Sequence, residues 1–189
     1  MAYLFFLLIF LVSCGGMTQE VPATYTSLNE SAPVYPDYRD VTIPCNIAPL
    51  NVMVNDAGEA FAGLITSSSG MKVVAQCETN KLFFDAAEWR SLLDASKGET
   101  LKVEVFVKRA DQWYAYAPHS LHVAPEPIDS FLSYRLIEPS YELYRQLGLY
   151  QRNLTNFEEQ PIYENNNTSS EVDNHCVNCH NYNNFDASN

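Results

Sequence analysis

Residues 101–108 alternate between apolar and charged side chains, and this pattern is the strongest constraint that the sequence places on the fold. In an extended strand, successive side chains point to opposite faces. Lys102, Glu104 and Lys108 therefore share one face, and the odd-numbered positions, all Leu or Val, share the other. The pattern predicts a strand with one buried face and one solvated face.

Several shorter β-prone segments accompany this strand. They are residues 41–54, 61–66, 71–77 and 113–117. Pro44 and Pro49 interrupt the first segment, which suits edge strands or strand starts, because proline cannot donate a hydrogen bond to a neighbouring strand. The turn-like run 67–70 separates the second segment from the third.

One amphipathic helix is expected over residues 85–94, where Asp85 and Glu88 have the spacing of a capping box. A second, short helix is expected over residues 137–148, with Gly148 as its C-cap. Many short strands and one helix between them predict a mainly β fold, an immunoglobulin-like β-sandwich. The apolar stripe of the first helix consists of Trp89, Leu92 and Leu93.

Shifts in composition divide the chain into five parts. Residues 1–13 are expected to be a lipoprotein signal peptide, 14–37 a polar tether, and 38–127 the β-sandwich domain. Residues 128–157 form a connecting segment with the short helix, and 158–189 form an Asn-rich tail. The tail is too poor in aliphatic residues to be firmly ordered alone.

The N-terminus begins with an apolar run, residues 1–12. Such a run is too short to span a bilayer, which needs roughly 20 residues, and is typical of a secretory signal. Residues 11–14 resemble a bacterial lipobox, in which Cys14 is lipidated, although no Lys or Arg precedes the run. We expect a protein that is lipid-anchored to a membrane of the cell envelope. Gly15 and Gly16, in place of acidic residues, favour an anchor that faces the periplasm.

The most specific chemical motif is C-x-x-C-H at residues 176–180, the attachment motif of c-type haem. Two thiols at this spacing add to the two vinyl groups of one porphyrin, and the histidine that follows reaches the iron. Cys176 and Cys179 are therefore expected to hold one covalent haem c, with His180 as its proximal iron ligand. An exported chain suits this role, because c-type haem is attached after translocation.

Three other roles for this cysteine pair are weaker alternatives. Half of a zinc site would need a second Cys/His pair at suitable spacing nearby. A thioredoxin-like redox pair would need a βαβ setting. A disulfide between Cys176 and Cys179 would form if haem were not supplied.

The distal ligand of the haem has to come from elsewhere, because residues 181–189 contain neither Met nor His. The upstream candidates are His119 and His122, for each of which the alternative is an exposed histidine in a loop or at a strand edge. Met53 and Met71 are expected to pack in the core rather than to bind iron.

Cys45 and Cys77 are the remaining two of the five cysteines, and both fall in predicted strands. In an oxidising compartment they either form a disulfide with each other or remain buried free thiols.

Charge and motif content exclude other classes of function. The chain carries 23 Asp and Glu against 11 Lys and Arg, a net charge of −12, which argues against binding to nucleic acid. It contains no recognisable catalytic triad, paired catalytic carboxylates or phosphate-binding glycine loop, so no enzymatic activity is expected.

Four segments together resemble a family of Bacteroidetes envelope lipoproteins. They are residues 35–51, 134–144, 148–157 and the haem motif at 176–180. The resemblance implies an N-terminal β-domain, a C-x-x-C-H segment and a C-terminal WD40-like (TolB-like) β-propeller. The propeller is not among these 189 residues, so we expect either a truncated form or a haem segment that works without it.

The sequence therefore predicts a membrane-anchored, cytochrome-like haem lipoprotein that transfers electrons or senses haem at the cell envelope. Its expected partners are the membrane, through the lipid, and a redox or envelope protein. The alternative is a non-enzymatic β-sandwich binding module, the N-terminal part of a propeller lipoprotein, in which the haem motif is idle.

Overall fold

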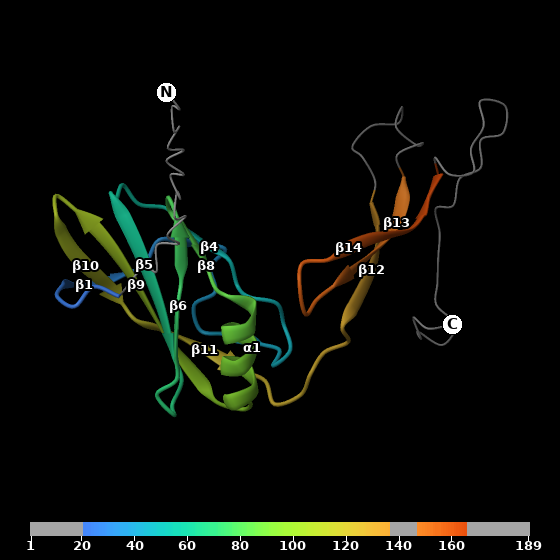
Figure 1. The fold of residues 1–189 in the computed structure, drawn as a ribbon, viewed down its shortest axis with the longest axis horizontal. Coiled ribbons are helices and arrows are strands. Elements are labelled where there is room, and N and C mark those ends of the chain that lie inside the picture. The colour runs from blue at the N-terminus through green and yellow to red at the C-terminus, as the bar shows by residue number, and fades with distance from the viewer. Residues whose placement is uncertain (1–20, 137–146, 166–189) are drawn as a thin grey trace, which may run out of the picture.

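The structure is a computed structural model that describes residues 21–136 and 147–165. The described part of the chain is mainly β, as predicted, and its strands form three sheets (Figure 1). The elements are β1 (Thr26–Ser31), β2 (Val34–Tyr35), β3 (Val41–Ile43), β4 (Val52–Val54), β5 (Ala60–Thr66), β6 (Lys72–Val74), β7 (Gln76–Glu78), β8 (Lys81–Phe83), α1 (Ala86–Ala95), β9 (Thr100–Arg109), β10 (Gln112–Ala117), β11 (His119–Val123), β12 (Phe131–Leu136), β13 (Gly148–Asn153) and β14 (Glu159–Glu164).

The first sheet is built around the long strand β9. On one side, β5 pairs with β9 in antiparallel register and β6 extends the sheet beyond β5. On the other side, β10 and β11 pair with β9 one after the other, separated by Pro118. Proline has no N–H to donate, so the break in the ladder falls there. β1 then adds in parallel to β10, and β3 adds in parallel to β11.

The second sheet consists of four short antiparallel strands in the order β2-β4-β8-β7. One buried cluster contains Val103 and Val105 from the first sheet together with Val54 and Leu82 from the second. The two sheets therefore pack against each other across a shared core, the arrangement of a β-sandwich. The predicted alternation in β9 is confirmed, because its Leu and Val positions are all buried.

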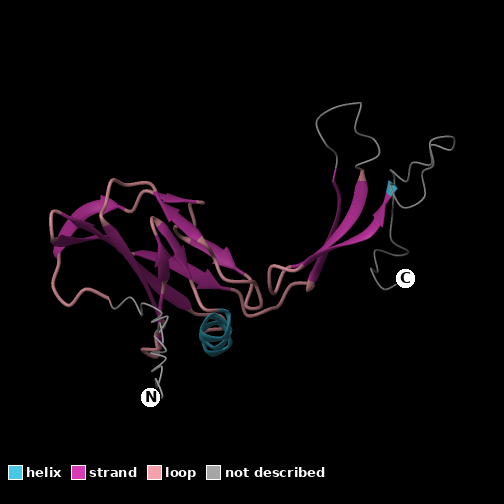
Figure 2. Ribbon diagram, turned by 45° about the horizontal axis from the view of Figure 1, so that its top comes forward, coloured by secondary structure: helices cyan, strands magenta, loops and turns pink. Residues whose placement is uncertain are grey.

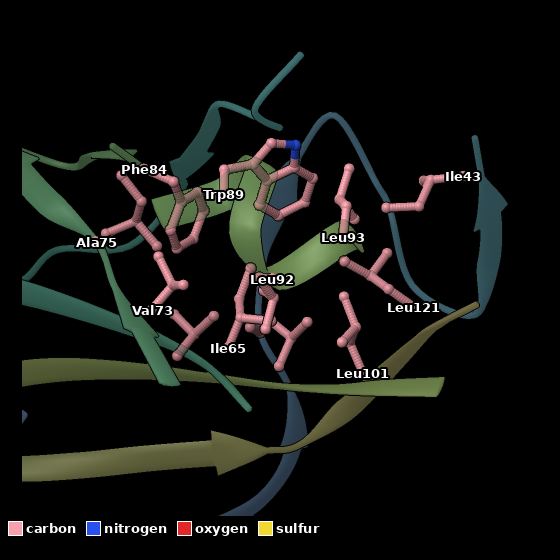
Figure 3. Close-up of a cluster of buried hydrophobic side chains, with 14 of the residues drawn as sticks. Ile43, Ile65, Val73, Ala75, Phe84, Trp89, Leu92, Leu93, Leu101 and Leu121 are labelled. Carbon is pink, nitrogen blue, oxygen red and sulfur yellow. The ribbon is translucent and has the colours of Figure 1, made fainter. Parts of the chain in front are cut away.

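Helix α1 covers one end of this core, at the connection from β8 to β9 (Figures 1 and 3). Asp85 caps the helix, as predicted, by accepting hydrogen bonds from the backbone N–H groups of the first turn. Trp89, Leu92 and Leu93 are each 0% exposed, which confirms the predicted apolar stripe. Trp89 also donates from Nε1 to the carbonyl of Ile47 at 3.0 Å, so its one polar atom is satisfied inside the core.

The prediction that residues 14–37 are only a tether is wrong for their C-terminal part. β1 and β2 lie in this segment, and each belongs to a different sheet. Before β1, the Tyr25 ring packs edge-on against Phe106 of β9, with 5.2 Å between the ring centroids. Edge strands tolerate polar side chains, which is why a polar composition concealed them.

The third sheet is a separate antiparallel unit in the order β12-β13-β14, and it projects from the sandwich (Figures 1 and 2). Its β13–β14 turn is held against the sandwich by two hydrogen bonds. Leu154 O accepts from the backbone N–H of Ala48 at 2.8 Å, and Thr155 O accepts from Arg90 at 3.0 Å. Nearby, the Asn46 amide pairs with the backbone N–H and C=O of Ile128.

This third sheet corrects the predicted organisation of residues 128–189. The connecting segment contains β12 and β13, and the start of the expected irregular tail is a strand, β14. Gly148 is the first residue of β13 rather than a helix C-cap, and the rest of the predicted short helix, residues 137–146, lies outside the described residues. Among the residues that are described, no helix has the length and apolar character needed to cross a bilayer.

Candidate haem-ligand and cysteine residues

The residues expected to bind haem and lipid lie outside the described part of the chain. Cys14 precedes it, and Cys176, Cys179 and His180 follow it. The described chain ends at Asn165, directly after β14, so the segment that carries the motif begins at the end of the third sheet. The candidates that the structure does place are His119, His122, Cys45 and Cys77.

His119 and His122 both lie on β11, but they point to opposite sides of the first sheet. His119 pairs with Val103, whose side chain is buried in the core, and His122 pairs with Thr100. Residues three positions apart in a strand face opposite ways, so the two imidazoles cannot approach one face of a single haem together. His122 is paired on both sides, with Thr100 of β9 and Thr42 of β3, whereas His119, the first residue of β11, is paired with β9 alone.

The His119 imidazole lines a small apolar pocket between the two sheets. Its Nδ1 is buried and has no hydrogen-bond partner among the described residues. A buried ring nitrogen without a partner is uncommon, and it is the atom through which a histidine binds a metal or a ligand. The other lining residues are Val34, Tyr38, Leu50, Val52, Gly63, Ile65, Leu82, Phe84, Val103, Val105 and Leu121.

Burial also sets the charge state of His119. Desolvation lowers its pKa below the ordinary value, and this outweighs the opposite effect of Asp40 and Asp37. The positive charge of Arg39, which forms an ion pair with Asp37, lowers the pKa of His119 further. His119 is therefore neutral near pH 7, which is the form that ligates iron.

His122 is in a different situation on the outer side of the sheet. Its Nδ1 lies 3.0 Å from the hydroxyl oxygen of Thr100, and one of the two atoms donates to the other. The ring is half-buried, and its orientation is set by this bond. The two histidines, which the sequence offered as equal candidates for the distal ligand, therefore lie in different surroundings: His119 faces the pocket and His122 faces outward.

Cys45 and Cys77 do not form a disulfide with each other in the structure; both are free thiols. Cys45 follows β3 rather than lying within a strand, and its buried Sγ points to the carbonyl of Pro125 at 3.6 Å. Cys77 lies on β7 in the second sheet, and burial raises the pKa of its thiol to about 11. Both are therefore packing residues, and the thiol of Cys77 is protonated at neutral pH.

The two methionines that were expected to pack in the core, Met53 and Met71, do not line the pocket. Met71 is 39% exposed at the start of the turn into β6, so the prediction that it packs in the core is wrong. Met53 is half-buried on β4, opposite Tyr35 and Lys81. Within the described ranges, no group of three or more His, Cys, Asp or Glu side chains could hold a metal ion.

One part-buried polar cluster was not predicted from the sequence. The Asp56 carboxylate, after β4, accepts hydrogen bonds from the Tyr116 hydroxyl and from Arg109, which also donates to that hydroxyl at 3.1 Å. Burial raises the pKa of Tyr116 to about 12, and the bond to Asp56 acts in the same direction. The partners are 53 and 60 positions away from Asp56, so no local pattern could have revealed the cluster.

No protein-family model and no curated protein matches the chain.

Proposed function

We propose that this protein is a membrane-anchored c-type haem lipoprotein that transfers electrons or senses haem at the cell envelope. The observation that carries the proposal is the C-x-x-C-H motif at residues 176–180. Cys176 and Cys179 would form the thioethers, and His180 would bind the iron from the proximal side. The haem would supply one-electron chemistry, with a potential set by its ligands and their surroundings.

The test is covalent attachment of haem in cells that also express a haem-attachment system. We expect a haem-stained band on a denaturing gel for the wild-type chain and none for the Cys176→Ala, Cys179→Ala double variant. The matched control is Cys45→Ala, Cys77→Ala, which removes the same number of thiols from residues that do not bind haem, and which should keep the band. A wild-type chain without a band, or a band that survives loss of the motif cysteines, would overturn the proposal.

His119 is the better of the two candidates for the distal ligand. Its Nδ1 has no partner in the described part of the chain and its ring is neutral, whereas the Nδ1 of His122 is engaged with Thr100. We expect His119→Ala to convert the haem from a low-spin to a high-spin absorption spectrum and His122→Ala to leave the spectrum unchanged. An unchanged spectrum in His119→Ala would assign the distal ligand to another group.

The anchor is tested separately at Cys14. The wild-type chain should incorporate labelled fatty acid and remain with the membrane fraction, and Cys14→Ala should do neither. The proposed setting is an envelope membrane with the domain in the periplasm, where a redox or envelope protein would be the partner.

A second candidate function is a non-enzymatic binding module built on an immunoglobulin-like β-sandwich, with an idle haem motif. It is favoured by the shared core of the two sheets, whose members all lie within residues 28–123. The structure places the correct truncation point after Asn165, because an earlier cut would remove β14. If the chain without residues 166–189 keeps its stability and its cellular partner, the result supports the binding module. If it loses the partner, the haem segment is the functional part.

A further inference from the structure

The outer face of the first sheet, the face turned away from the shared core, carries a second small cluster of buried residues. Phe106 of β9 is 1% exposed although its side chain points to this face. Val21 and Trp113 pack against the cluster, and Tyr25 packs against Phe106. The chain therefore enters the domain across this face. The other buried members of the cluster are Ala62, Leu64 and Ala115.

The distance from the anchor to this face is short. Val21 follows Cys14 by seven positions in the sequence. Fully extended, seven residues span at most about 25 Å. A lipid on Cys14 therefore holds Val21, and with it the part of the outer face that Val21 packs against, within about that distance of the bilayer.

The side chains on the outer face suit the headgroup region of a bilayer. Lys72, Lys102 and Lys108 point to this side, because each pairs across the sheet with another outward residue. Glu104 is the acidic residue among the outward positions of β9, and it pairs with Lys102 at 2.8 Å. Lys108 is also paired, with Asp111 of the turn after β9 at 2.7 Å, so three lysines accompany two acids on this face of a chain whose net charge is −12.

Aromatic side chains accompany these lysines. Tyr25 is 45% exposed and Trp113 is half-buried, and both types are enriched where proteins meet the membrane–water interface. An acyl anchor combined with cationic and aromatic side chains is the two-part arrangement that holds peripheral proteins stably on a bilayer.

We propose that the outer face of the first sheet lies against the headgroups of the membrane to which Cys14 is anchored, with Trp113 and Tyr25 at the interface. The proposal rests on the lipid anchor of the proposed function. Beyond the anchor, it gives the orientation of the domain on the membrane and identifies an anionic lipid surface as the binding partner of this face. The second sheet also exposes an aromatic residue, Tyr35, at 65%, but Tyr35 lies on the opposite layer of the sandwich and farther along the chain from the anchor.

The two tryptophans of the chain provide the experiment. The lipidated protein is reconstituted into vesicles of anionic and zwitterionic phospholipids, with and without lipids brominated close to the headgroup. Bromine quenches tryptophan emission only at short range. Trp89 is 0% exposed in the core and should be unaffected, whereas Trp113 should lose most of its emission. Trp113→Phe should abolish the quenching, and the matched control Trp113→Phe, Tyr35→Trp, with its tryptophan on the other sheet, should remain unquenched.

Flotation of the vesicles separates the two ways in which this could fail. If the protein floats with the vesicles but Trp113 is not quenched, or if the Tyr35→Trp probe is quenched as strongly, the orientation is wrong and the anchor stands. If the protein does not float, the lipid anchor is wrong and the orientation falls with it, while the haem-attachment test is unaffected.

Discussion

Replacing Asp56 by alanine tests whether the part-buried cluster of Asp56, Arg109 and Tyr116 holds the two sheets together. Asp56 follows β4 of the second sheet, while Arg109 and Tyr116 lie on β9 and β10 of the first. The Asp56 side chain is 14% exposed and that of Arg109 is 38% exposed. Tyr116 is 4% exposed, so its O–H loses its acceptor when the carboxylate is removed, while its oxygen still accepts from Arg109.

The size of the effect follows from these exposures. A hydrogen bond to a charged group contributes about 1.5–3 kcal/mol, and a buried group that loses its partner costs about 1–3 kcal/mol. The ion pair with Arg109 is partly solvated, so its share is about 0–1 kcal/mol. We expect Asp56→Ala to lower the free energy of unfolding by about 2–3 kcal/mol, mostly through Tyr116. Urea unfolding followed by circular dichroism measures it.

The pH dependence gives an independent check. Burial raises the pKa of Asp56, but hydrogen bonds from Tyr116 and Arg109 outweigh it and hold the pKa below the ordinary value. A carboxyl with a lowered folded pKa stabilises the fold above its unfolded pKa, about 3.9, and loses that contribution as the pH falls through the folded pKa. The difference between wild type and Asp56→Ala should therefore shrink below about pH 4.

A double-mutant cycle with Tyr116→Phe isolates the bond between the two side chains. We expect a coupling energy of about 1–2 kcal/mol, because each single variant already removes the shared bond. Tyr116→Phe should also abolish the loss of stability that the raised Tyr116 pKa predicts between pH 10 and about 12. A coupling energy near zero, with a pH-independent cost of Asp56→Ala, would refute the assignment.

Three further changes probe other parts of the fold. Asp85→Ala removes the α1 cap and should lower the free energy of unfolding by about 1 kcal/mol, measured by urea titration. In a variant whose other cysteines are alanine, the buried Cys45 should react with a thiol reagent at neutral pH only after unfolding, and the half-buried Cys77 should react slowly because its raised pKa keeps the thiol protonated; fast reaction of Cys45 in the folded chain would contradict its burial. Gly148→Ala should loosen the third sheet, because an added Cβ would lie 2.6 Å from the Tyr150 ring, and hydrogen exchange should increase in β12–β14 but not in the sandwich.

What could be predicted from the sequence was the local structure whose cause is local. The alternation over residues 101–108 and the cap at Asp85 need only neighbouring residues to be recognised, and both are present as predicted. The tether and tail predictions failed because β1 and β14 acquire their structure from distant partners. Thr26 pairs with Tyr114, and Pro161 within β14 pairs with Tyr150 despite being a poor strand former.

The candidate site was predicted incompletely for a reason that the sequence itself contained. In residues 119–123, Leu121 and Val123 alternate with Ser120 and His122, so His119 shares the apolar face. Applying the period of two to this short run would have placed His119 in the core and His122 outside. The pocket, and the absence of a partner for Nδ1 within residues 21–136 and 147–165, could not have been predicted, because they depend on side chains from both sheets.

The two proposals together assign a spacer role to the sandwich. The outer face of the first sheet would lie on the membrane. β1 and β10 lie at one end of the sandwich, and the third sheet projects from the other end, where α1 lies (Figures 1 and 2). The hydrogen bonds of Ala48 and Arg90 to the β13–β14 turn hold that sheet to the sandwich, and the haem motif follows it in the chain. A connection of this kind would present a haem away from the bilayer, where a soluble redox partner can reach it. Substituting Arg90 by alanine would then alter the rate of electron exchange with a partner without altering covalent haem attachment.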